Sequence, residues 1–182
     1  MHGIVFYQLN SFVVKTHGLT TWFELLERAG VPKKTYLPTQ VYPDTELASL
    51  VRQASEITSQ PVGAILEQFG EFIVPSMLRV YEGSIKPEWD LFDILENTEK
   101  TMHKAVRFAD KRADPPKLVC IRLSRESVLI HYSSDRKMVE LGIGIIKGLA
   151  KAKNEKISLF VTEVSDGTDI EIRRYRSLLI DN

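Results

Sequence analysis

The chain has 182 residues, a single cysteine and a formal net charge of zero, because 24 lysines and arginines balance 24 aspartates and glutamates. This length suits one domain with one sizeable core, and 43% hydrophobic with 26% charged residues is typical of a globular protein. The balanced charge provides no field toward nucleic acid or anionic lipid, so we expect neither as a partner. One cysteine excludes an internal disulfide framework. No stretch reaches the roughly 20 apolar residues of a membrane span, and we expect a cytoplasmic protein.

Apolar spacing and capping residues predict several helices in the first half of the chain. The predicted helices cover residues 3–16, 21–29, 44–57, 61–75 and 89–109. Thr21, with Glu24 three residues later, is a capping-box start for the second helix. Asp44 is the expected N-cap of the third helix, and Pro75 is expected to kink or end the fourth.

After Pro115 and Pro116 the pattern changes to strands. The predicted elements are strands at 117–123 and 128–133, a helix at 137–153, and strands at 157–164 and 170–179. Several helices followed by β-β-α-β-β indicate an α+β fold, with a helical N-terminal half and an antiparallel sheet half. No linker marks a second independent domain, so we expect one domain over residues 1–182. Gly144 and Gly148, four residues apart in the last helix, indicate close approach of a packing neighbour. A phosphate-binding loop is disfavoured because the GxGxxG spacing is absent.

A cluster of polar side chains follows the second predicted strand. Tyr132, Ser134 and Arg136 lie at alternate positions, and in an extended segment they would share one face. Two hydroxyls and a guanidinium form a set of donors for carboxylates or phosphate. His103 lies on the 89–109 helix, where an ordinary half-buried histidine is one reading. A haem is the other reading, because it needs one axial imidazole and a cationic partner for its propionates.

Motifs along the whole chain resemble those of the haem nitric oxide/oxygen binding (H-NOX) family, which is related to the haem domain of soluble guanylate cyclase. They are Met1 and Gly3, Pro61, the run Phe69-Gly70-Glu71-Phe72, His103, Pro115-Pro116, and Tyr132-x-Ser134-x-Arg136. The resemblance implies haem b, with His103 as the proximal iron ligand and Tyr132, Ser134 and Arg136 on the propionates. Pro116 would press on the porphyrin and bend it. A helical subdomain over about 1–62 would then precede haem-contacting helices and sheet over about 63–182, with the haem between the two halves.

The same resemblance assigns an apolar distal wall. Its members are Val5, Leu9, Ile73, Met77, Leu141 and Ile145. Oxygen-binding members of the family have a tyrosine where this chain has Leu141, with polar support at positions matching Leu9 and Ile73. Bound oxygen gains from a distal hydrogen-bond donor, and nitric oxide and carbon monoxide need one much less. We therefore expect a sensor that binds nitric oxide and carbon monoxide, and binds oxygen poorly.

The resemblance implies a sensor without enzymatic activity that signals to a separate partner, either a histidine kinase or a cyclic-di-GMP enzyme. We expect no zinc, because the stretch from Thr162 to Ile172 lacks the cysteines and histidine of some family members. The alternatives are a haem-free interaction module on the same fold and an oxygen-binding member. A peroxidase is disfavoured because the distal residues provide no general acid or base.

Overall fold

The structure is a computed structural model that describes residues 1–31, 34–109, 111 and 114–175. Its helices are α1 (Gly3–His17), α2 (Leu19–Arg28), α3 (Asp44–Thr58), α4 (Val62–Val80), α5 (Leu91–Asn97), α6 (Lys104–Ala109) and α7 (Val139–Ala152), with a 3-10 turn η1 (Glu82–Ser84) and a π-helical segment η2 (Glu99–His103). The strands are β1 (Lys117–Arg122), β2 (Ser127–Ser133), β3 (Ile157–Val164) and β4 (Gly167–Arg174). All strand pairs are antiparallel, in the order β1-β2-β4-β3. The predicted α+β class and element order are confirmed.

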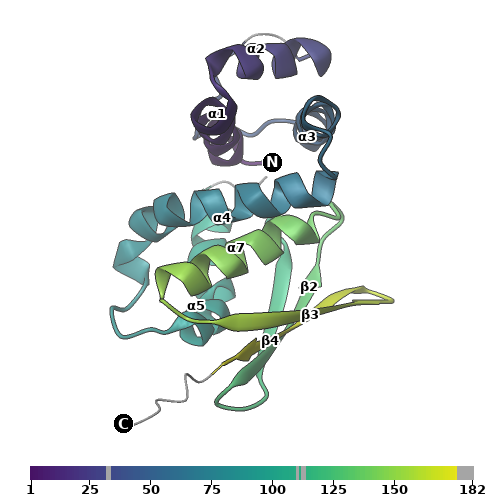
Figure 1. Ribbon diagram of the computed structural model, residues 1–182. Helices are drawn as coiled ribbons and strands as arrows, with labels where there is room; N and C mark the ends of the chain where they lie inside the picture. Colours follow the sequence, from purple (N-terminus) through teal and green to yellow (C-terminus); the bar gives the residue numbers. More distant parts are fainter. Residues whose placement is uncertain (32–33, 110, 112–113, 176–182) are drawn as a thin grey trace, which may run out of the picture.

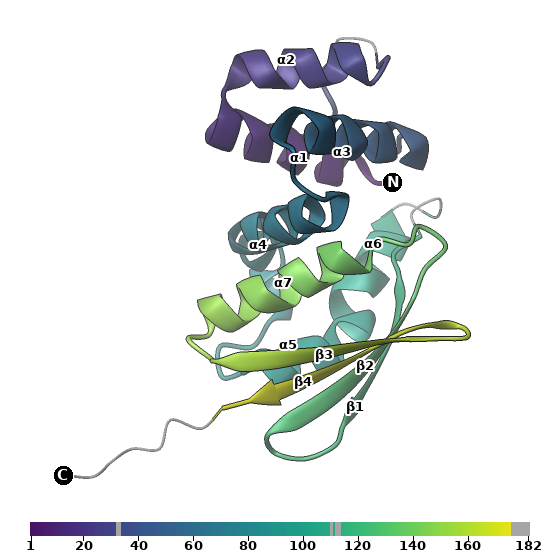
Figure 2. The ribbon, with the colours of Figure 1, turned by 45° about the vertical axis from the view of Figure 1, so that its right-hand side comes forward.

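The helices form two layers above the sheet. Figure 1 shows α1, α2 and α3 as a layer of their own, with α4 and α7 between this layer and the strands. Figure 2, turned by 45°, shows the same order. Within the part of the chain that the structure describes, no helix is long and apolar enough to cross a bilayer.

Two buried apolar clusters correspond to these layers. The first joins α1, α2 and α3 to the N-terminal part of α4 and ends with Ile73. The second begins with Val74 and joins the rest of α4 to α5, α7 and the inner face of the sheet. Met77 and Ile145 pack against both clusters. The fourth helix is therefore shared by the two halves of the core.

Helices α4 and α7 pack against each other at backbone distance. A Cβ at Gly144 would lie 2.0 Å from the carbonyl oxygen of Glu67, and a Cβ at Gly70 would lie 2.4 Å from that of Leu141. At Gly148 it would meet the side chain of Val74 at 2.6 Å. The predicted close approach at Gly144 and Gly148 is confirmed, because only a residue without a Cβ fits there.

Two predicted helix starts are wrong in detail. Helix α2 begins at Leu19, and the Thr21 hydroxyl donates to the backbone of His17 instead of capping the helix. Helix α3 has Pro43 at its N-cap position, and the carboxylate of Asp44 bonds groups elsewhere in the fold. In both cases the side chain bonds a group other than the unpaired backbone amides at the start of its own helix.

Pro75 does not end α4, which continues to Val80. A proline inside a helix removes one hydrogen bond and crowds the carbonyl four residues before it. Here the two residues before the proline are both buried, Ile73 in the first cluster and Val74 in the second. Burial of these side chains outweighs the local cost of the proline.

The predicted helix over 89–109 is divided into α5, η2 and α6. Helix α5 begins with a capping box between Asp90 and Asp93, and η2 contains a π-type bond from the His103 amide to the carbonyl of Thr98, at 3.1 Å. Strand β4 begins at Gly167 and not at residue 170, and the predicted continuation over 176–179 lies outside the described residues.

Candidate functional site

His103 is the last residue of η2, and one of its two ring nitrogens is anchored. Its Nδ1 lies 2.7 Å from Oε1 of Glu99, and the His103 side chain is 16% exposed. Because an ionised carboxylate only accepts hydrogen bonds, Nδ1 carries the proton in this pair. Among the residues that the structure describes, Nε2 of His103 has no polar partner. The free nitrogen is therefore the one available to a metal ion.

The carboxylate of Glu99 is held by two further groups. The backbone amide of Leu118, in β1, donates to Oε1 at 3.0 Å, and the guanidinium of Arg107 donates to Oε2 at 2.5 Å. Burial alone would raise the pKa of Glu99, but the hydrogen bonds from His103, Arg107 and Leu118 lower it below its ordinary value. Glu99 therefore stays ionised at neutral pH.

Tyr132, Ser134 and Arg136 lie close together, though not by the predicted strand alternation. Strand β2 ends at Ser133, and Arg136 lies in the turn that follows. Ser134 links to Arg136, because its hydroxyl accepts from the Arg136 amide at 3.3 Å. Tyr132 is buried, and burial raises its pKa above the ordinary value, so that the phenol remains a donor.

The β1–β2 pairing places Tyr132 near the histidine segment. Tyr132 is the cross-strand partner of Leu118, whose amide bonds Glu99. Met102, next to His103, belongs to the same buried cluster as Tyr132 and Ile146 of α7. The predicted proximal residue and the start of the predicted propionate clamp are thus assembled around one strand pair. Pro116 is half-buried and directly precedes β1.

Arg136 already binds a carboxylate in this structure. Its Nε donates to Oδ2 of Asp44 at 2.7 Å, and its Nη1 donates to the backbone carbonyl of Asp114. The N-terminal amine of Met1 donates to Asp44 as well. Burial alone would raise the pKa of Asp44, but its bonds with the amine and with Arg136 hold that pKa below the usual range.

The predicted distal residues all belong to the first apolar cluster or pack against it, and Met77 and Ile145 also contact the second. Leu9 and Ile73 are buried in the first cluster. The remaining four, Val5, Met77, Leu141 and Ile145, are partly buried and pack against it. They come from α1, α4 and α7, and the close packing of α4 on α7 fixes the relative positions of the last two helices.

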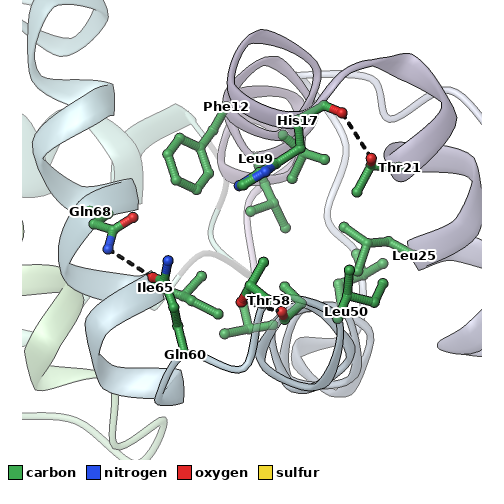
Figure 3. Close-up of a pocket in the computed structure, with 14 residues that line it drawn as sticks. Leu9, Phe12, His17, Thr21, Leu25, Leu50, Thr58, Gln60, Ile65 and Gln68 are labelled. Carbon is green, nitrogen blue, oxygen red and sulfur yellow. Dashed lines mark hydrogen bonds between the residues drawn. The ribbon is translucent and has the colours of Figure 1, made fainter.

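A small apolar cavity lies beside this wall, between α1, α2, α3 and α4. Figure 3 shows Leu9, Phe12, Leu25 and Ile65 around it, and Leu9 also belongs to the predicted distal group. Gln68 closes one side by donating to Gln60 at 2.9 Å. None of the predicted proximal or propionate residues lines this cavity.

The residues present fit a haem. The imidazole of His103 offers one anchored ring with a free nitrogen, which is the donor that haem iron takes from a protein. Arg136 provides a guanidinium already directed at a carboxylate, with the two hydroxyls of Tyr132 and Ser134 beside it. A planar apolar group with carboxylate side chains matches this combination of hydrogen-bond donors and apolar walls.

The family profile described as Haem-NO-binding matches residues 2–161 of this chain. The chain belongs to the haem-NO-binding family. Members of this H-NOX family bind haem and act as gas-sensor domains that are not themselves catalytic.

Solved H-NOX structures share the fold over nearly the full chain. An H-NOX protein from S. oneidensis in the Fe(II)NO ligation state has a TM-score of 0.90 at 22% identity, covering 97% of this chain and 100% of that one. Fe(II) unliganded H-NOX protein from K. algicida has a TM-score of 0.89 at 20% identity, covering 98% of each chain. At these identities the likeness shows the H-NOX fold alone.

Curated relatives extend beyond the matched region. The soluble guanylate cyclases gcy-32 and gcy-34 of Caenorhabditis elegans are 24% and 25% identical, over 83% and 88% of this chain. The match covers only 23% and 24% of those proteins, so this H-NOX chain spans about a quarter of their length.

Two residues of the site were not predicted as functional. Glu99 precedes His103 by one helical turn, so its position on the same face was a usable signal. Asp44 was predicted only as a helix cap. Its bond to Arg136 spans 92 residues, a separation that no local pattern could indicate.

Proposed function

We propose that this H-NOX chain is a nitric oxide sensor that holds haem b through His103 and binds oxygen poorly. Ferrous haem, when bound, supplies the coordination position at which nitric oxide or carbon monoxide is held. His103 would provide the axial nitrogen. Tyr132, Ser134 and Arg136 would hold the propionates, and Pro116 would press on the ring from beside β1.

One observation carries this proposal. Nε2 of His103 has no polar partner among the described residues, while Nδ1 is fixed by a carboxylate that is itself held on both oxygens. With the proton on Nδ1, the lone pair of Nε2 is free to bind iron. This asymmetry is what a metal ligand needs.

The preference for nitric oxide over oxygen is supported by the character of the distal wall. Leu141, Leu9 and Ile73 have no side-chain donor to offer a bound gas. Gln8 and Ser76, polar residues of α1 and α4, bond each other at 2.7 Å. Oxygen would therefore lack the hydrogen bond that stabilises it, whereas nitric oxide and carbon monoxide would lose little.

The proposed output is a conformational switch read by a separate partner. His103 would be released from its tether when nitric oxide is bound, and its movement would reach β1 through Glu99 and Leu118. The gas must bind the released state more tightly for this switch to work. By resemblance to the family, the partner is a histidine kinase or a cyclic-di-GMP enzyme, and the sensor acts in the cytoplasm without zinc.

Spectroscopy of the reconstituted protein tests the proposal. We expect haem-loaded wild-type protein to show a Soret band that shifts with nitric oxide under anaerobic conditions and does not change on brief exposure to air. The variant His103→Gly should lose haem, and free imidazole should restore binding.

Each alternative predicts a different result. A haem-free interaction module would show no Soret band, and His103→Gly would change nothing. An oxygen-binding member would give a stable new spectrum in air. Either outcome would overturn the assignment.

A further inference from the structure

The starting observation is the contact between Glu99 and His103. The two side chains meet at 2.7 Å, and both are largely withdrawn from solvent, with exposed fractions of 27% and 16%. The contact uses the ring nitrogen opposite to the one proposed for the iron. Any change that Glu99 causes in the electron density at Nδ1 is therefore transmitted through the ring to Nε2, the nitrogen proposed to bind the metal.

Glu99 is not a flexible surface carboxylate. The Leu118 amide fixes Oε1, the same oxygen that the imidazole contacts, from the backbone of β1. Arg107, one turn beyond His103, fixes Oε2. The direction of the histidine ring is therefore set by a carboxylate anchored to both the sheet and α6.

Glu99 and His103 both lie in the π-helical segment. In η2 the His103 amide bonds the carbonyl of Thr98, five residues earlier, so the backbone is wider than in an α-helix. Glu99 and His103 are the first and last residues of this segment. Segments of this kind occur often at functional sites.

The contacts of the Glu99 carboxylate with His103 and with Arg107 have opposite effects on the histidine as a ligand. A carboxylate that accepts from Nδ1–H makes the ring a stronger electron donor at Nε2. Arg107 draws charge from the same carboxylate, which weakens it as an acceptor for the ring. The strength of His103 as a ligand is then set by the balance between these two contacts.

We propose that Glu99 is a positioning residue that orients His103 and strengthens it as an iron ligand, and that Arg107 moderates this effect. The inference rests on the proposed haem binding and deepens it. A simple helix-surface ion pair between residues four apart is the competing account, and such a pair adds little to stability. That account leaves the iron–histidine bond unaffected.

Resonance Raman spectroscopy of the ferrous, gas-free holoprotein measures this bond directly through its iron–histidine stretching frequency. We expect Glu99→Ala to lower the frequency and Glu99→Gln, which keeps a hydrogen-bond acceptor without the charge, to give an intermediate value. Arg107→Ala should raise it above wild type. Haem affinity should fall about 10-fold in Glu99→Ala, the lower end of the range for losing a partner of a metal-binding histidine.

Glu96→Gln is the matched control, because Glu96 lies on the preceding turn and bonds Arg122, not His103. Its frequency should equal that of wild type. Equal frequencies in wild type, Glu99→Ala and Arg107→Ala would overturn the inference while leaving haem binding intact. A wild-type protein that binds no haem would instead remove the proposed function itself.

Discussion

Tyr132 is a buried phenol, which makes it the most informative residue of the predicted propionate clamp. Its exposed fraction is 7%, and burial is the main influence on its hydroxyl. Burial raises its pKa above the ordinary value, so the hydroxyl keeps its proton across the physiological pH range. A protonated phenol held in place is suited to donate to a carboxylate.

Replacing Tyr132 by phenylalanine removes that donor and keeps the ring. A hydrogen bond to a charged group contributes about 1.5–3 kcal/mol, so we expect haem to dissociate roughly 10-fold or more faster from Tyr132→Phe. The dissociation rate can be followed by transfer of haem to an excess of a haem scavenger. Tyr81→Phe, at the end of α4, is the control and should match wild type. An unchanged rate in Tyr132→Phe would mean that this hydroxyl does not contact the propionates.

At the level of single residues, sequence reasoning finds the groups that carry a motif and misses their partners. His103, Tyr132 and Arg136 stand out because their residue types and spacing have a chemical meaning. Glu99 and Asp44 do not, because their roles depend on contacts with Leu118 and Arg136 that only the folded chain creates. Asp44 was assigned to the nearest helix for the same reason.

The packing of α4 on α7 depends on glycine, and this makes it sensitive to a single methyl group. A Cβ at Gly144 would lie 2.0 Å from the Glu67 carbonyl oxygen and 2.8 Å from its carbon, both of which are backbone atoms. Backbone cannot rotate away as a flexible side chain can, so the two helices would have to separate. Ion pairs such as Lys147 with Glu67, at 2.6 Å, would be disturbed with them.

We expect Gly144→Ala to lower the free energy of unfolding by about 1–3 kcal/mol, the usual cost of overpacking a close contact. Equilibrium urea denaturation of the haem-free protein measures this change. Gly142→Ala is the matched control in the same helix, because its Cβ would lie 3.7 Å from the Tyr132 ring, an ordinary contact. A loss of stability in Gly142→Ala equal to that in Gly144→Ala would show that helix α7 does not tolerate alanine for another reason.

At the level of elements, periodicity predicts where helices and strands lie better than how they begin, end or break. The strand over 157–164 is predicted to the residue, because its β-branched and aromatic residues are bounded by clear turns. Helix α4 passes through Pro75 because burial of Ile73 and Val74 in two different clusters outweighs the proline. The widened turn of η2 has no signature in propensity, because its five residues are ordinary for a helix.

At the scale of the whole molecule, the described residues form two apolar clusters that share one helix. Met77 and Ile145, both predicted distal residues, pack against both clusters. The ion pair between Asp44 of α3 and Arg136 joins the same two halves from the outside. A haem held by His103 and Arg136 would therefore contact groups from each half, and its binding energy would be coupled to the stability of the entire fold.

Haem should consequently stabilise the whole protein and not only its site. At a free haem concentration 100 times the dissociation constant, ligand binding adds about 2.7 kcal/mol. For a chain of this size that corresponds to a rise of roughly 5–10 °C in the melting temperature. Differential scanning calorimetry with and without haem measures the shift. His103→Ala should melt like the haem-free wild type and show little shift when haem is added. An equal shift in both proteins would indicate non-specific haem adsorption.

The wider backbone of η2 also restricts how this chain can change in length. A π-type turn contains one residue more than the α-helical turn it replaces, so removing any one residue between Thr98 and His103 would restore regular winding. A wider turn accommodates its extra residue without changing the phase of the helix beyond it, so α6 would keep its face. Removing Lys100, Thr101 or Met102 would instead place Glu99 three residues before His103 and not four, and would move the carboxylate away from Nδ1. In this region the number of residues is as strict a requirement as their identity.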